Sequence, residues 1–131
     1  MGDGMRNAAE MIVGPQQQID VVSVEPGDAG QEILDALKKA VHNVDSGEGV
    51  LLLTDLFGGT PTNIGCALLS EAPVEVVTGF NLPLLIKALT SRTDKVELAL
   101  LARTAAEYGQ RHISVAGDIL QGAKEKKGEA K

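Results

Sequence analysis

One loop of the chain combines a carboxylate with a bend that suits an anion. Asp55 directly follows a short apolar run, and Gly58 and Gly59 then permit backbone conformations that are closed to other residues. Thr60 before Pro61 is typical of a helix start, with the threonine as the N-cap and the proline in the first turn. Because the free N–H groups of a helix start attract anions, this pattern predicts an anion site beside a carboxylate.

The chemistry of this loop has more than one interpretation. A carboxylate beside an anion site suggests a histidine as a second participant, because a carboxylate fixes an imidazole tautomer and stabilises its protonated form. The simpler interpretation is a strand–turn–helix corner that Thr60 caps. Neither a Walker P-loop nor a GxGxxG loop is present. Two amides, Asn63 in the following helix and Asn81 before Pro83, could shape the site or serve a structural role.

Composition limits the classes of protein to consider. The chain has 131 residues, 44% of them hydrophobic and 23% charged, which is typical of one globular domain. A net charge of −6 argues against a nucleic-acid partner, and no apolar run is long enough for membrane insertion. The single cysteine, Cys66, cannot form an internal disulfide and is expected to be a buried apolar residue. A cytoplasmic location is therefore expected, and nothing predicts a metal or a cofactor.

Strand patterns and helix patterns alternate along the chain. The expected strands are residues 19–24, 50–54, 74–78 and 112–115, and the expected helices are 4–13, 29–44, 62–69, 83–90 and 95–108. Alternation of this kind predicts an α/β fold with a mainly parallel sheet whose ligands bind at the carboxyl edge. Residues 1–120 form the expected domain, and residues 121–131 form a charged, flexible tail.

The string LLLTDLFGGTPTN, followed by VEVVTGFNLPLLIKAL, resembles the IIA component of the mannose-family sugar phosphotransferase system, a type-4 EIIA domain. NAAEMIVGPQQQIDVVSVEPGD and GQRHISVAGDIL extend the resemblance over roughly residues 5 to 120. The resemblance implies a flavodoxin-like, three-layer, doubly wound sheet in a homodimer. It also implies a phosphoryl carrier without a cofactor, which accepts phosphate from HPr on a histidine and passes it to a IIB component.

The same resemblance assigns roles to residues of the loop. Asp55 would orient the phosphorylated histidine, and Gly58, Gly59 and Thr60 would receive the phosphoryl oxygens. Pro61, Asn63 and Asn81 would shape the site. Any IIB component would be a separate chain, and association with a membrane-embedded IIC/IID complex is expected without membrane insertion of this chain.

The acceptor histidine of the family is missing from this sequence. The family carries it in a Thr-His-Gly stretch at the end of a first, interior strand, whereas the match places Met1 already inside the following helix. His42 and His112 are expected away from the carboxyl edge, with His112 near a strand entry. Our hypothesis is that the chain starts at an internal methionine, which leaves the sheet without its first strand. A stop codon directly before Met1 in the gene, with no Thr-His-Gly, would contradict this hypothesis.

Two other functions stay open at this point. The chain could be a non-catalytic regulatory or binding relative that has lost its histidine. It could also be the related phosphocarrier subunit of a dihydroxyacetone kinase system, although FGGTPTN and Asn81-Leu82-Pro83 favour the mannose family. The sequence does not name the sugar.

Overall fold

A two-stranded parallel sheet lies at the centre of the fold. The computed structural model describes residues 1–25, 27–55, 60–70 and 73–129. Strands β1 (Val50–Thr54) and β2 (Val74–Thr78) pair in parallel, with Val50 opposite Val74 and Thr54 opposite Thr78. Both strands have the bounds that the sequence predicted, because each is a short run of aliphatic and β-branched residues.

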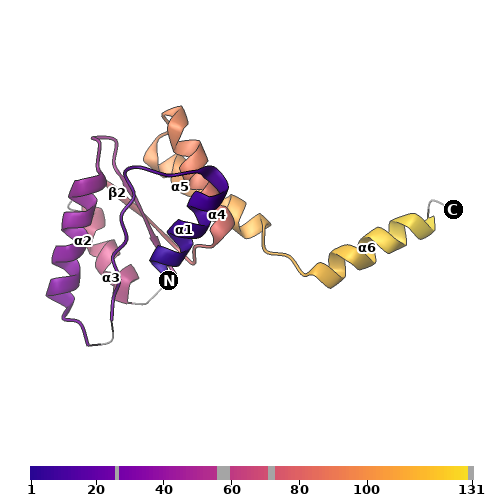
Figure 1. Ribbon diagram of the computed structural model, residues 1–131, viewed down its shortest axis with the longest axis horizontal. Helices are drawn as coiled ribbons and strands as arrows, with labels where there is room; N and C mark the ends of the chain where they lie inside the picture. Colours follow the sequence, from indigo (N-terminus) through magenta and orange to yellow (C-terminus); the bar gives the residue numbers. More distant parts are fainter. Residues whose placement is uncertain (26, 56–59, 71–72, 130–131) are drawn as a thin grey trace.

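Helices lie on both sides of this sheet, and the last one extends away from it (Figure 1). They are α1 (Gly2–Val13), α2 (Gly30–Val44), α3 (Thr60–Ala67), α4 (Leu82–Ser91), α5 (Leu98–Arg111) and α6 (Ala116–Glu129), with 3-10 turns η1 (Leu68–Ser70) and η2 (Arg92–Asp94). The expected helix at 95–108 thus occupies 98–111 instead. Its start is delayed because Lys95 adopts a left-handed conformation, with φ of 52°, which interrupts a right-handed helix.

The sheet separates two apolar layers. On one side, residues of α2 and η1 pack on both strands, with Leu37, Val41, Val50, Leu68 and Val74 buried together. On the other side, α1, α4 and α5 bury Ala9, Leu84, Leu85, Ala88, Leu89 and Ala105. Successive residues of β1 supply both layers, since Leu52 packs on the first and Leu53 on the second. This is the three-layer α/β arrangement of a flavodoxin-like fold.

The prediction of a strand at residues 19–24 is wrong. These residues pair with neither β1 nor β2, and no interior strand lies between them and β1 in the described part of the chain. Their side chains still alternate as in a strand, because Ile19 packs beside α4 and Val22 packs beside α2. β-branched composition favours an extended backbone, but a strand also needs a neighbour to bond with.

The C-terminal region also differs from expectation. Residues 112–115 form a turn at His112 and then a segment in no strand among the residues described, so the predicted last strand is wrong. Residues 116–129 form α6, which extends away from the other helices in Figure 1, where a flexible tail was expected after residue 120. The local sequence AKEKKGE is rich in Ala, Lys and Glu, which have high intrinsic helix propensity, and this explains the difference. The domain boundary at residue 120 stays a prediction.

Candidate functional site

The two strands end at the same edge of the sheet. Thr54 and Thr78 lie opposite one another in the parallel register, so Asp55 and the loop after β2 leave the sheet side by side. The backbone N–H of Phe80 donates to the carbonyl of Thr54 over 3.1 Å, which ties the two exits together. Thr54 is buried, whereas Asp55 is exposed. The structure therefore presents the Asp55 carboxylate at the carboxyl edge of the sheet, where ligands of such folds bind.

The predicted anion site lies only partly within the described residues. Gly58 and Gly59 fall outside them, so their predicted contacts with phosphate stay predictions. Helix α3 begins at Thr60, with Pro61 as its second residue, one position from the predicted N-cap arrangement. The side chains of Thr60 and Pro61 are also outside the described part, and the capping role of Thr60 stays a prediction. Asn63, one turn into α3, is exposed.

A glycine that the sequence analysis did not single out brings α3 against the sheet. A Cβ atom on Gly65 would overlap the side chain of Leu52 on β1 and touch that of Val76 on β2. Only a residue without a side chain lets the helix backbone approach the strands so closely. The sequence signal for Gly65 was an isolated glycine within a helical pattern.

Cys66 follows Gly65 and is exposed, so the prediction that Cys66 is buried is wrong.

Asn81 joins two helices at the carboxyl edge. Its Oδ1 accepts from the backbone N–H of Leu84 at 3.0 Å, which makes it the N-cap of α4. Its Nδ2 donates to the carbonyl of Gly109 at 3.0 Å, near the end of α5. A Cβ atom on Gly109 would lie 2.9 Å from Asn81 Oδ1, so this glycine makes the contact possible. The Asn81 amide therefore fixes the walls beside the site.

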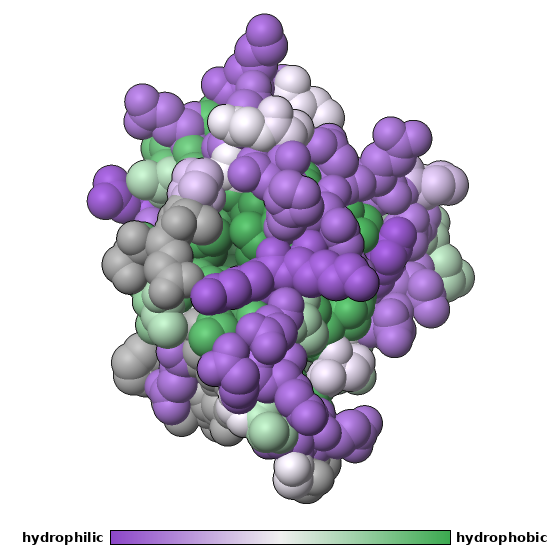
Figure 2. Space-filling view, turned by 90° about the vertical axis from the view of Figure 1, so that its left-hand side faces the viewer, coloured by the Kyte–Doolittle hydropathy of each residue, from purple (hydrophilic) through white to green (hydrophobic). Residues whose placement is uncertain are grey.

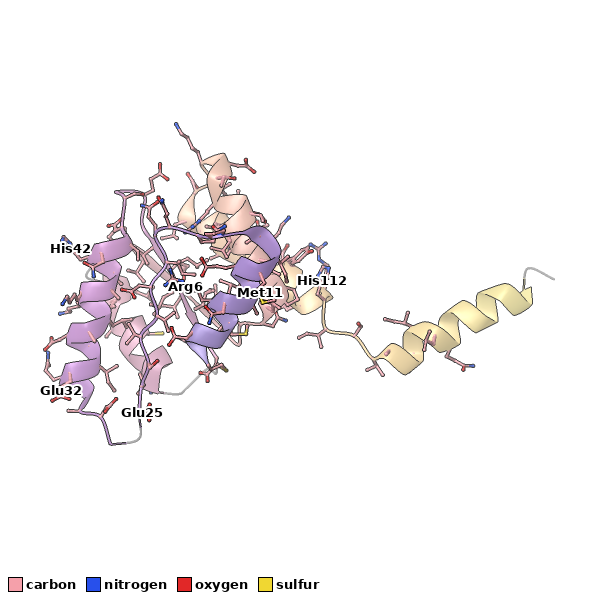
Figure 3. All side chains as sticks on the ribbon, viewed as in Figure 1. Arg6, Met11, Glu25, Glu32, His42 and His112 are labelled. Carbon is pink, nitrogen blue, oxygen red and sulfur yellow. The ribbon has the colours of Figure 1, made fainter. Side chains whose placement is uncertain are left out.

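The two histidines of the chain lie on opposite sides of the molecule (Figure 3). His42 is exposed in the last turn of α2, just before the loop that leads into β1. That position is at the amino end of the strands, away from Asp55. The expectation that His42 lies away from the site agrees with this placement.

His112 lies elsewhere than expected. It follows α5, whose residue Gly109 bonds to Asn81, so His112 emerges at the carboxyl edge rather than near a strand entry. Its Nδ1 lies 2.7 Å from the carbonyl oxygen of Tyr108, and its ring stacks on the Tyr108 ring at a centroid distance of 3.9 Å. The C-terminal end of a helix carries partial negative charge, which disfavours a phosphoryl group there. His112 is therefore poorly placed to accept phosphate.

A groove on another face contains none of the predicted site residues. It encloses about 350 Å³ between the extended segment and α2, lined by Asp20, Val21, Val22, Ser23, Ala36, Lys39, Ala40 and Asn43. Figure 2 looks onto the α2 side of the molecule, where hydrophilic side chains surround smaller apolar areas. In the part of the chain described, no cluster of three or more His, Cys, Asp or Glu side chains could hold a metal ion.

Solved structures share this fold. The EIIA phosphotransferase component from Streptococcus agalactiae superposes with a TM-score of 0.80 at 28% identity, covering 88% of this chain and 89% of that one. The mannose/sorbose-specific IIA subunit from Enterococcus faecalis gives a TM-score of 0.78 at 27% identity, covering 88% and 86% of the two chains. The sheet, its two covering layers and these superpositions define an α/β domain of the flavodoxin-like class, of the type found in phosphotransferase IIA components.

Sequence comparison identifies the family. Residues 1–105 match the family model described as EIIA-man, PTS system fructose IIA component. The chain belongs to this family.

Individual relatives agree with this assignment. The fructose-specific EIIA component of Bacillus subtilis is 26% identical over 121 residues, which covers 92% of this chain and 82% of the relative. The mannose-specific EIIAB component of Escherichia coli is 28% identical over 106 residues, or 80% of this chain. The matched region spans 33% of that longer relative.

Among the described residues, no helix is both long enough and apolar enough to cross a membrane.

Proposed function

We propose that this protein is a cytoplasmic phosphoryl carrier that accepts phosphate from HPr on a histidine and passes it to a IIB component. The observation that carries the proposal is the exposed Asp55 carboxylate at the end of β1, with the start of α3 five residues further on. A carboxylate beside a helix start suits a phosphorylated imidazole, because the carboxylate orients the ring and the helix N–H groups face the phosphoryl oxygens. Because the chain belongs to a phosphotransferase IIA family, we take the anion at this site to be a phosphoryl group.

The acceptor histidine is not one of the 131 residues. His42 lies at the wrong end of the sheet, and His112 lies at the C-terminal end of a helix with Nδ1 against a carbonyl. β2 occupies one edge of β1, and no described residue pairs with the other edge. We expect a preceding strand to fill that edge and to bring its histidine to Asp55, because parallel strands end at a common edge.

Transfer between two histidines needs little covalent help from the protein. A P–N bond to the histidine of HPr breaks as a P–N bond to the acceptor forms, and no net proton is released. The protein must therefore align the reacting atoms and balance the phosphoryl charge. Asp55 would hold the acceptor ring with one nitrogen facing the phosphoryl group. The amides at residues 58–60 would supply the compensating dipoles.

Phosphorylation by purified components tests the proposal. The protein, produced together with the codons that precede Met1 in its gene, is incubated with phosphoenolpyruvate, enzyme I and HPr, and then with a IIB component. It should gain an acid-labile phosphate and lose it to the IIB component, while the 131-residue chain gains none. A longer protein that binds HPr but gains no phosphate would instead indicate a regulatory relative.

The protein is further proposed to be a homodimer that can associate with a membrane-embedded IIC/IID complex. The C-terminal arm, defined as residues 112–129, supports the dimer. Ile113, Val115, Ile119 and Leu120 are each more than half exposed on it, and α6 extends away from the body in Figure 1. Apolar side chains concentrated on such an arm favour burial against another chain. A second copy of this chain would cover them.

A further inference from the structure

Arg92 connects the end of α4 to the linker between α1 and the extended segment, which we define as residues 19–24. Its Nη1 donates to the carbonyl of Gln18 at 3.1 Å, and its Nη2 donates to the carbonyl of Gln17 at 2.6 Å. Nη2 also donates to the side-chain oxygen of Gln16 at 3.1 Å. One planar guanidinium therefore holds three consecutive residues that are more than 70 positions away in sequence.

The extended segment has few other directional contacts. Its residues are in no strand pair among those described. Ile19 and Val22 pack in the apolar layers, but apolar contacts do not fix position along the segment. Near its start, Gln18 Nε2 approaches the carbonyl of Val44 only at 3.5 Å. The linker before it has two anchors: the Arg92 guanidinium ties it to the end of α4, and the backbone N–H of Gln16 donates to Glu10 Oε2 on α1 at 2.8 Å.

The clamp also fixes an uncommon backbone conformation. Gln18 has φ of 53°, in the left-handed region that non-glycine residues rarely adopt. The carbonyl of this residue accepts from Arg92, so the bond stabilises the turn that directs the chain into the segment. Within the described residues Arg92 has no acidic partner, and burial lowers the pKa of its guanidinium. The backbone carbonyls are thus the groups that balance its charge.

The extended segment runs from the amino end of the strands to their carboxyl end. Gln18 lies near Val44, the last residue of α2, and so at the amino end of β1. The chain then reaches Ala29, the N-cap of α2, at the carboxyl end. There the backbone N–H of Glu25 donates to Asp28 Oδ2 at 2.8 Å, which closes the turn. This turn leads into α2 at the carboxyl end of the strands, which is the end at which Asp55 follows β1.

We infer that Arg92 is a positioning residue for the phosphoryl-transfer site, which acts at a distance by clamping the linker 16–18 and so fixing the extended segment along the sheet. The inference rests on the proposed function for its catalytic consequence only. The clamp itself is a property of the chain that can be measured separately. Because lysine cannot donate to three acceptors from one planar group, Arg92→Lys should fail as Arg92→Ala does.

Backbone dynamics test the clamp. In ¹⁵N relaxation measurements, amides of residues 19–24 should have order parameters near 0.85 in the unchanged protein and below about 0.6 in Arg92→Ala and Arg92→Lys. Amides of Leu51–Leu53 should not change. Arg103→Ala is the matched control, because Arg103 is exposed on α5 and bonds to no described residue. Equal order parameters in Arg92→Ala and Arg103→Ala would overturn the inference.

Transfer kinetics test the consequence for the site, in the longer protein that carries its acceptor histidine. Both Arg92 variants should lower kcat for phosphoryl transfer by about tenfold or more, with the KM for phosphorylated HPr unchanged. A mobile segment with unchanged kcat would overturn the positioning role. Absence of transfer in the unchanged protein would instead contradict the proposed function, while the relaxation data would still decide whether Arg92 is a clamp.

Discussion

At the scale of single residues, the polar groups of the site divide into one that is available for chemistry and one that is committed to structure. Asp55 is exposed at the end of β1, whereas both polar atoms of the Asn81 amide are bonded to the ends of α4 and α5. Sequence reasoning could place both residues at the carboxyl edge, because each follows a recognisable strand. It could not predict the partners of Asn81, because Gly109 lies 28 residues away in sequence.

Replacing Asp55 should affect chemistry much more than stability. In the longer protein, Asp55→Ala should slow phosphoryl transfer from HPr by about 100-fold, because the acceptor ring loses the group that orients it. Asp35→Ala, which removes an exposed carboxylate from α2, is the control and should transfer at the normal rate. Rapid-quench measurement of the transfer rate checks this. An Asp55→Ala protein that transfers normally would show that the assigned role is wrong.

Gly109→Ala should destabilise the fold. The new Cβ atom would lie 2.9 Å from both Asn81 Oδ1 and Leu84 Cβ, so α4 and α5 must separate. Overpacking of this kind costs about 1–3 kcal/mol of the free energy of unfolding. Gly4→Ala in α1 is the control, because its Cβ atom would meet no atom within 4 Å. Urea unfolding measures both variants, and equal stability of the two would contradict the packing described here.

At the scale of elements, the sequence pattern predicted strands that have a partner in the sheet and failed for the segment that has none among the described residues. β1 and β2 have the predicted bounds because each is a short apolar run that pairs with the other. Residues 19–24 have similar composition but no strand neighbour among the described residues, so their strand prediction failed on a contact that local sequence does not contain. Helix α6 at 116–129 was not predicted, because charge was weighted above the helix propensity of Ala, Lys and Glu.

The extended segment should still contribute to stability through its side chains. Val22 packs against the α2 layer, so Val22→Ala should lower the free energy of unfolding by about 1–2 kcal/mol. The neighbouring Ser23 is exposed, and Ser23→Ala should change it by less than about 0.5 kcal/mol. Thermal or urea unfolding distinguishes the two variants. If they prove equally stable, the segment does not pack as described.

At the scale of the whole molecule, two surfaces of the fold favour contact with further residues, one with a preceding strand and one with another chain. One edge of β1 has no strand beside it within the residues described, and the C-terminal arm exposes four large apolar side chains. An unpaired strand edge and a concentrated apolar surface each favour association. The first suits a strand that carries the acceptor histidine, and the second suits another copy of the chain.

The arm should determine the oligomeric state. Ile119→Glu combined with Leu120→Glu places two charges on its apolar surface, so the dimer should dissociate to a monomer because burying those charges is unfavourable. Gln121→Glu, one residue further on and exposed, is the control and should stay dimeric. Light scattering during size-exclusion chromatography measures the mass. A double variant that stays dimeric would exclude the arm as the interface.

On the proposed function, a histidine outside these 131 residues accepts the phosphoryl group beside Asp55. Mass spectrometry at alkaline pH, applied to peptides of the longer protein after phosphorylation by HPr, locates that group directly. We expect one phosphohistidine, in the peptide that precedes Met1, and none at His42 or His112. Phosphate on either of those two histidines, or on Asp55 itself, would contradict it.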